Sequence, residues 1–79
     1  MSKLVESFLR IFMQTPRFTD TETVVVGTDA FFTLASQRGV QVSRDSVQTG
    51  ISESLHLPPN EVESFLRERL TQLLPDENN

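Results

Sequence analysis

Few side chains in this 79-residue chain have the chemistry of an active site. The chain has one histidine and no cysteine, which excludes thiol nucleophiles, disulfides and thiolate metal sites. A serine nucleophile needs a base, yet His56 stands beside an expected turn and no Gly-x-Ser-x-Gly motif surrounds any serine. One histidine among scattered carboxylates gives no metal-ligand spacing. We therefore expect no enzyme, no catalytic residue, no metal and no cofactor.

Charged side chains divide unevenly along the chain, whose net charge is −4. Residues 1–44 carry five Lys and Arg against four Asp and Glu, a net +1, whereas residues 45–79 carry two against seven, a net −5. A binding surface responds to the local field more than to the total charge. The C-terminal half is therefore expected to repel nucleic-acid phosphates.

Apolar residues recur every three or four positions in several segments, which is the spacing of helices with one buried face. We expect helices over residues 2–14, from 28 or 29 to about 37, from 43 to about 55, and from 60 to about 74. Two exposed ion pairs at four-residue spacing, Glu6 with Arg10 and Glu63 with Arg67, are expected on the outer faces of the first and last helices.

Residues 21–26 contain three adjacent valines, which favour extended backbone. The only other short extended pattern is 40–42, and a lone two-stranded ribbon is marginal, so helix or turn is preferred for 21–26. Gly27 is expected to break the pattern, Phe18 to point inward, and Gly39 to end a helix in the left-handed conformation.

The sequence thus predicts an all-α fold, a single-domain bundle of four to five short helices over residues 1–75, with a disordered polar tail over 76–79. No apolar run approaches the ~20 residues of a membrane span. We expect a soluble cytoplasmic protein with no membrane partner.

The stretch from Phe8 to Val47 contains four short motifs. They are Phe8-Leu9, Thr15-Pro16-Arg17-Phe18, Ala30-Phe31-Phe32-Thr33-Leu34-Ala35-Ser36-Gln37-Arg38-Gly39 and Val40-Gln41-Val42-Ser43. In order and spacing they resemble the small nitrogen-fixation-associated leader family, often written nif-eleven, although Val40 stands where that family usually has an aromatic residue. The resemblance implies either a leader recognised by peptide-modifying enzymes or a free-standing protein. The lack of a double-glycine cleavage site and of core cysteines favours the free-standing form.

Residues 51–67 hold a second pattern, whose apolar positions are Ile51, Leu55, Leu57, Val62 and Leu66. This spacing resembles the helix-turn-helix of sigma-factor C-terminal domains, in which two helices pack about a tight turn. His56 occupies the turn position usually given to glycine, where a positive φ is preferred. The resemblance implies DNA binding through the last helix.

If that helix entered a major groove, the residues facing the DNA would be Asn60, Glu61, Ser64, Arg67 and Arg69. Asn60 would pair with adenine and Glu61 would accept a hydrogen bond from cytosine. Affinity comes mainly from neutralised phosphates, however, and this half of the chain is acidic. Direct DNA binding is therefore the alternative function and not the favoured one.

The favoured function is a non-enzymatic regulator or adaptor that binds another protein, with a homodimer as one form of that association. Adjacent aromatic residues point about 100° apart on a helix, so either both phenylalanines at 31 and 32 are buried or one projects to a partner. The residues expected to bind are Phe31, Phe32, Arg38, Glu61, Glu63 and Arg67. Ile11 and Met13 flank the stripe of the first helix and form a candidate apolar edge for self-association.

Overall fold

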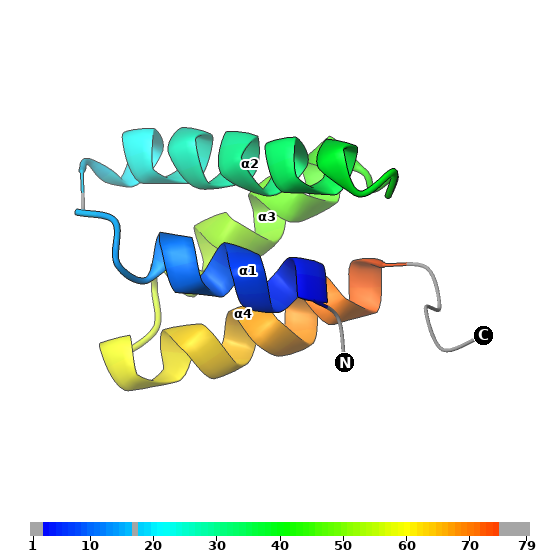
Figure 1. Cartoon of the computed structure of the whole chain (residues 1–79). Helices are drawn as coiled ribbons and strands as arrows, with labels where there is room; N and C mark the ends of the chain where they lie inside the picture. The colour runs from blue at the N-terminus through cyan, green and yellow to red at the C-terminus, as the bar shows by residue number, and fades with distance from the viewer. Residues whose placement is uncertain (1–2, 17, 75–79) are drawn as a thin grey trace.

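Four α-helices follow one another in the computed structural model, which describes residues 3–16 and 18–74. They are α1 (Lys3–Phe12), α2 (Asp20–Gln37), α3 (Arg44–Ser54) and α4 (Pro59–Leu73). α1 packs against α2 and α4, and α3 packs against the same two helices (Figure 1). No strand occurs within the described ranges, and the predicted all-α class is confirmed.

The core lies between the four helices and is centred on aromatic side chains. Phe8 of α1 is fully buried, stacks on Phe12 with ring centroids 5.2 Å apart, and meets Phe31 of α2 edge-on, also at 5.2 Å. Ile51 of α3 and Leu66 of α4 are equally buried. Every helix therefore contributes to one continuous apolar cluster.

α2 is longer than the sequence indicates, because it runs unbroken through the three valines and Gly27. Thr19 caps its first turn: the Thr19 hydroxyl accepts from the Glu22 amide at 3.2 Å and donates to the Glu22 carboxylate at 2.8 Å. Of the helix and turn that the sequence left open for 21–26, the structure has the helix, and the predicted break at Gly27 is wrong. Here the glycine permits close packing, since a Cβ at Gly27 would lie 2.8 Å from Cε1 of Phe12.

The connections between the helices confirm some expectations and correct others. Gly39 has a φ of 68° after the end of α2, and the Ser43 hydroxyl caps α3 by accepting from the Ser46 amide at 3.4 Å. His56 does not adopt the positive φ that its turn position favours, because Gly39 alone has a positive φ among the described residues. Phe18 is 51% exposed and does not point inward as expected.

Ion pairs connect helices that are distant in sequence. Glu6 does not bond to Arg10 as predicted but accepts from Nε of Arg67 in α4 at 2.7 Å. The predicted pair of Glu63 with Arg67 is confirmed at 2.8 Å. The expected helix start at 2 and the expected tail over 76–79 lie outside the described residues.

None of the described helices is long and apolar enough to cross a membrane.

Candidate interaction surface

The two adjacent phenylalanines of α2 have different environments. Phe31 is 0% exposed within the core, so the expectation that it contacts a partner is wrong. Phe32 lies about 100° further round the helix, is partly buried, and has the guanidinium of Arg44 5.3 Å from its ring centroid. One ring thus belongs to the core, and the other is covered on one side by an arginine.

The other residues expected to bind a protein do not gather on one surface. Arg38 is exposed at the end of α2, where it donates to the Ser7 hydroxyl at 3.3 Å. Glu61, Glu63 and Arg67 lie on α4, which does not contact α2. The set therefore falls into two separate groups.

The residues expected to read DNA do share one helix. Asn60, Glu61 and Ser64 are exposed over the first turns of α4. The two arginines of the set, however, already bind carboxylates: Arg67 binds Glu6 and Glu63, and Arg69 binds Glu53 at 2.5 Å. The exposed start of α4 thus presents no free cation of its own.

The hydrogen bonds between Glu6 and Arg67 also shift the pKa of both groups. The guanidinium of Arg67 lowers the pKa of the Glu6 carboxyl below its ordinary value, more than partial burial raises it. The pKa of Arg67 is raised, mainly by its hydrogen bonds to Glu6 and then to Glu63. Both groups keep their charges at neutral pH, and each neutralises the other within the chain.

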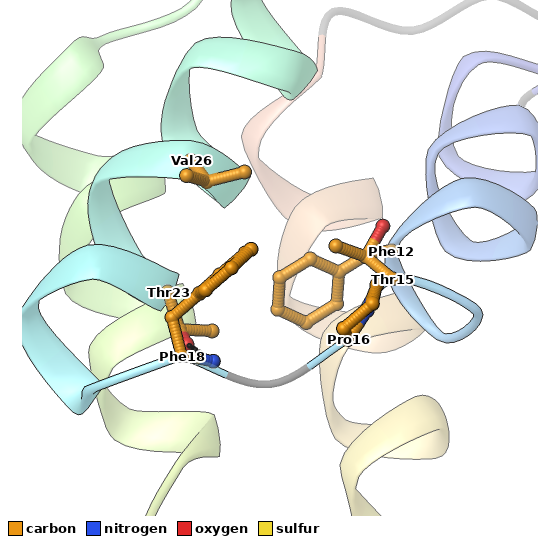
Figure 2. A pocket seen from close by; sticks show the side chains of 6 residues that line it. All are labelled: Phe12, Thr15, Pro16, Phe18, Thr23 and Val26. Carbon is orange, nitrogen blue, oxygen red and sulfur yellow. Dashed lines mark hydrogen bonds between the residues drawn. The ribbon is translucent and has the colours of Figure 1, made fainter.

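Large exposed apolar side chains lie on a different surface, along the border of α1 and α2. Phe18 is 51% exposed, Ile11 49% and Val26 43%. Figure 2 shows Phe18 and Val26 on one side of a small hollow, with Phe12, Thr15 and Pro16 facing them. The Phe18 amide donates to the Thr23 hydroxyl at 3.2 Å, which holds this residue at the start of α2.

The helical register places Ile11 beside the same border. α1 and α2 run antiparallel, because Phe8 meets Phe31 and Phe12 meets Gly27. Ile11 is one turn from Ser7, which Arg38 reaches from α2, so Ile11 lies on the flank of α1 that faces α2.

On α2 the four-residue spacing continues from Val26 to two partly buried side chains, Ala30 and Leu34. We call the resulting strip the α1–α2 edge and define it by Ile11, Phe18, Val26, Ala30 and Leu34.

Charges around the α1–α2 edge differ from those elsewhere in the bundle. Lys3, Asp20 and Glu22 are exposed and join no ion pair among the described residues. The Arg38 guanidinium likewise has only the Ser7 hydroxyl among the described groups. By contrast, Arg44, Arg67 and Arg69 each bind a carboxylate, and Arg10 lies on the other flank of α1, beside Glu6 and Glu63.

The sequence pattern indicates one part of this edge but not the rest. Ile11 was expected to be exposed and is, whereas Met13 is partly buried. The sequence does not predict that Phe18 and Val26 are exposed. The pattern placed Phe18 in the core, and with helix or turn both possible for 21–26 it could not tell which valine faces solvent. Treating Asp20–Gln37 as one helix would have placed Val24 inside and Val26 on the outer flank.

The part of the chain that the structure describes holds no group of three or more His, Cys, Asp or Glu side chains arranged to bind a metal ion. The chain matches no family model, and no significant match was found among curated proteins or solved structures.

Proposed function

We propose that this protein is a non-enzymatic interaction module, a small regulator or adaptor that binds another protein through the α1–α2 edge. The observation that carries the proposal is the clustering of Ile11, Phe18 and Val26, each 43% or more exposed, along one helix border. Contiguous exposed apolar side chains on a small domain are characteristic of contact surfaces. A partner that covers these side chains removes apolar area from water, which is favourable at roughly 25 cal/mol per Å².

The charge distribution supports protein binding over DNA binding. A DNA-binding helix gains its affinity from lysines and arginines that neutralise phosphates. In α4 both arginines bind carboxylates of the same chain, and Glu61 and Glu68 are exposed beside them. DNA binding through Asn60, Glu61 and Ser64 stays the competing proposal, supported only by their exposure.

The test compares two neighbouring valines of α2 that are similarly exposed. Val26 belongs to the edge, whereas Val25 is 49% exposed on the flank facing α3, beside Gln48 and His56. Val26→Asp should abolish binding of protein partners in pull-downs from native lysate, and Val25→Asp should leave the same partners bound. Circular dichroism would show that both variants keep the wild-type helix content.

Two results would contradict the proposal. Equal capture by wild type and by Val26→Asp would show that the edge is not the contact surface. Retention of the wild-type chain on mixed-sequence DNA at 50 mM salt, lost steeply as salt rises, would favour the competing function instead.

A further inference from the structure

We propose that the occupant of the α1–α2 edge is a second copy of the same chain, packed against the first about a two-fold axis. This inference rests on the proposed function, because it names the partner of that edge. Two features carry it: the position of the apolar side chains along the edge and the signs of the charges on either side of them.

Apolar side chains fill the middle of the edge. Val26 lies one helical turn after Glu22 and three turns before Arg38, with Ala30 and Leu34 between Val26 and Arg38. Ile11 of α1 lies beside this stretch of α2, because Phe12 packs against Gly27. A second edge laid over the first would cover the exposed faces of both Ile11 and Val26.

Opposite charges lie on either side of the apolar stretch from Val26 to Leu34. Glu22, in the first turn of α2, joins no ion pair among the described residues. Arg38 follows α2 at the other end. It lies about 24 Å from Glu22 along the helix, at 1.5 Å per residue, and its guanidinium donates to the hydroxyl of Ser7 in α1. Each copy therefore presents an acidic end and a basic end along one line.

A two-fold axis through the middle of the edge reverses this line in the second copy. Glu22 of one copy then faces Arg38 of the other, and the same contact forms again on the far side of the axis. An isologous interface must be complementary to itself in this way. A partner of uniform charge would be repelled at one of the two ends.

The size of the chain gives this pairing an energetic advantage. A domain of 79 residues buries a smaller share of its apolar surface than a larger domain does. Covering half-exposed side chains such as Ile11 and Val26 adds buried area without further chain, and the association stabilises the folded state by mass action.

The test reverses one charge at a time in the full chain. Sedimentation velocity across a micromolar concentration series should show a wild-type dimer. Glu22→Arg and Arg38→Glu should each weaken the dimer about tenfold, because every interface then holds two like-charge contacts. Glu22→Gln keeps a side-chain oxygen that accepts from the Thr19 hydroxyl but removes the charge, so it should weaken the dimer less than Glu22→Arg does.

Mixing the two charge-reversal variants is the decisive step. One variant presents two cations and the other two carboxylates, so a mixed dimer has attractive contacts at both ends. An equimolar mixture should therefore regain wild-type affinity, as should a chain that carries both substitutions. A variant that failed to fold would not be rescued in either way.

The outcomes separate this inference from the proposed function. A mixture that associates no better than the single variants would overturn the second copy as occupant, as would a wild-type chain that stays monomeric. If that monomer still captured another protein and Val26→Asp lost it, the proposed function would stand without the inference. If Val26→Asp changed neither self-association nor capture, both would fall.

Discussion

α1 meets α4 on one flank and α2 on the other, and the side chains at the two borders differ in kind. Toward α4, Glu6 accepts two hydrogen bonds from Arg67, at 2.7 and 3.2 Å, and Arg67 also binds Glu63. Toward α2, Ile11 stands half-exposed one turn from Ser7, whose hydroxyl accepts from Arg38, and Arg38 joins no ion pair among the described residues. An ion pair of the same chain joins α1 to α4, whereas no ion pair among the described residues joins α1 to α2, and apolar side chains are exposed there.

This difference indicates where a partner gains most. Binding at the α4 border would remove water from an ion pair that is already satisfied, and the Coulombic attraction often fails to offset that desolvation. Binding at the α2 border covers apolar surface, which is favourable at roughly 25 cal/mol per Å². Glu22 and Arg38 join no ion pair among the described residues, so they can form new contacts there without breaking one of those pairs.

The largest expected effect on stability concerns the aromatic pair of α2, in which a core residue, Phe31, is followed directly by a partly exposed one, Phe32. Phe31→Ala should lower the free energy of unfolding by about 3–5 kcal/mol, because Phe31 is fully buried against Phe8. Phe32→Ala should cost less, about 1–2 kcal/mol, since Phe32 is only partly buried and loses its packing against the edge of the core and its contact with Arg44. Urea denaturation followed by circular dichroism measures both.

A milder variant keeps this comparison measurable if Phe31→Ala does not fold. Phe31→Leu retains most of the apolar volume and should lie between the two alanine variants in stability. Equal losses for Phe31→Ala and Phe32→Ala would contradict the division of the pair into a core residue and a surface residue.

Alanine substitutions at two helical glycines should change the free energy of unfolding by smaller amounts and in opposite directions. They test how closely neighbouring helices pack at each glycine. Gly27→Ala should destabilise the fold by about 1 kcal/mol, because the new Cβ would lie 2.8 Å from the buried Phe12 ring and overpacking outweighs the gain in helix propensity. Gly50→Ala should stabilise by about 0.5 kcal/mol. Its nearest neighbour is Cγ of Arg69 at 3.1 Å, on a side chain that can shift. Thermal unfolding of both variants gives the two signs, and a stabilising Gly27→Ala would show that α1 and α2 are not in close contact there.

Local rules account for most of the fold that the sequence predicted. The Ser43 cap, the left-handed Gly39 and the apolar spacing of α4 each depend on neighbouring residues, and the structure has all three. Gly27 and the three valines could not be assigned in this way. Gly27 packs closely against Phe12 and Ile51, which lie in other helices, and Val24 is buried in the core. Tertiary contacts of this kind override local propensity.

The candidate surface was harder to predict than the fold, because exposure is a property of the assembled bundle. Sequence spacing indicated Ile11. Phe18, however, is held where its backbone N–H donates a hydrogen bond to the Thr23 hydroxyl, and the exposure of Val26 depends on the exact phase of α2. The pairing of Glu6 with Arg67 spans 61 residues and replaced the local pair with Arg10. Contacts at such separation leave no periodic signal in one sequence.

The smallest expected effect concerns the Glu6–Arg67 ion pair between α1 and α4 and the pH dependence of its contribution to stability. The Arg67 guanidinium lowers the pKa of Glu6 below 4.5, so the folded state favours the carboxylate more than the unfolded chain does. The pair therefore stabilises the fold at neutral pH and loses this contribution as the pH falls through the folded-state pKa. The wild type should have a higher Tm than Glu6→Gln at pH 7, and the two values should converge below pH 4.5.

The matched control for Glu6 is Glu61→Gln, which removes an exposed carboxylate of α4 that joins no ion pair among the described residues. It should leave Tm nearly unchanged at both pH values, since isolated surface charges contribute little. If the difference between wild type and Glu6→Gln persisted at acidic pH, the contribution would come from packing of the side chain. Side-chain packing and not charge would then stabilise the α1–α4 border, and this border would differ from the α1–α2 edge only in its lower apolar exposure.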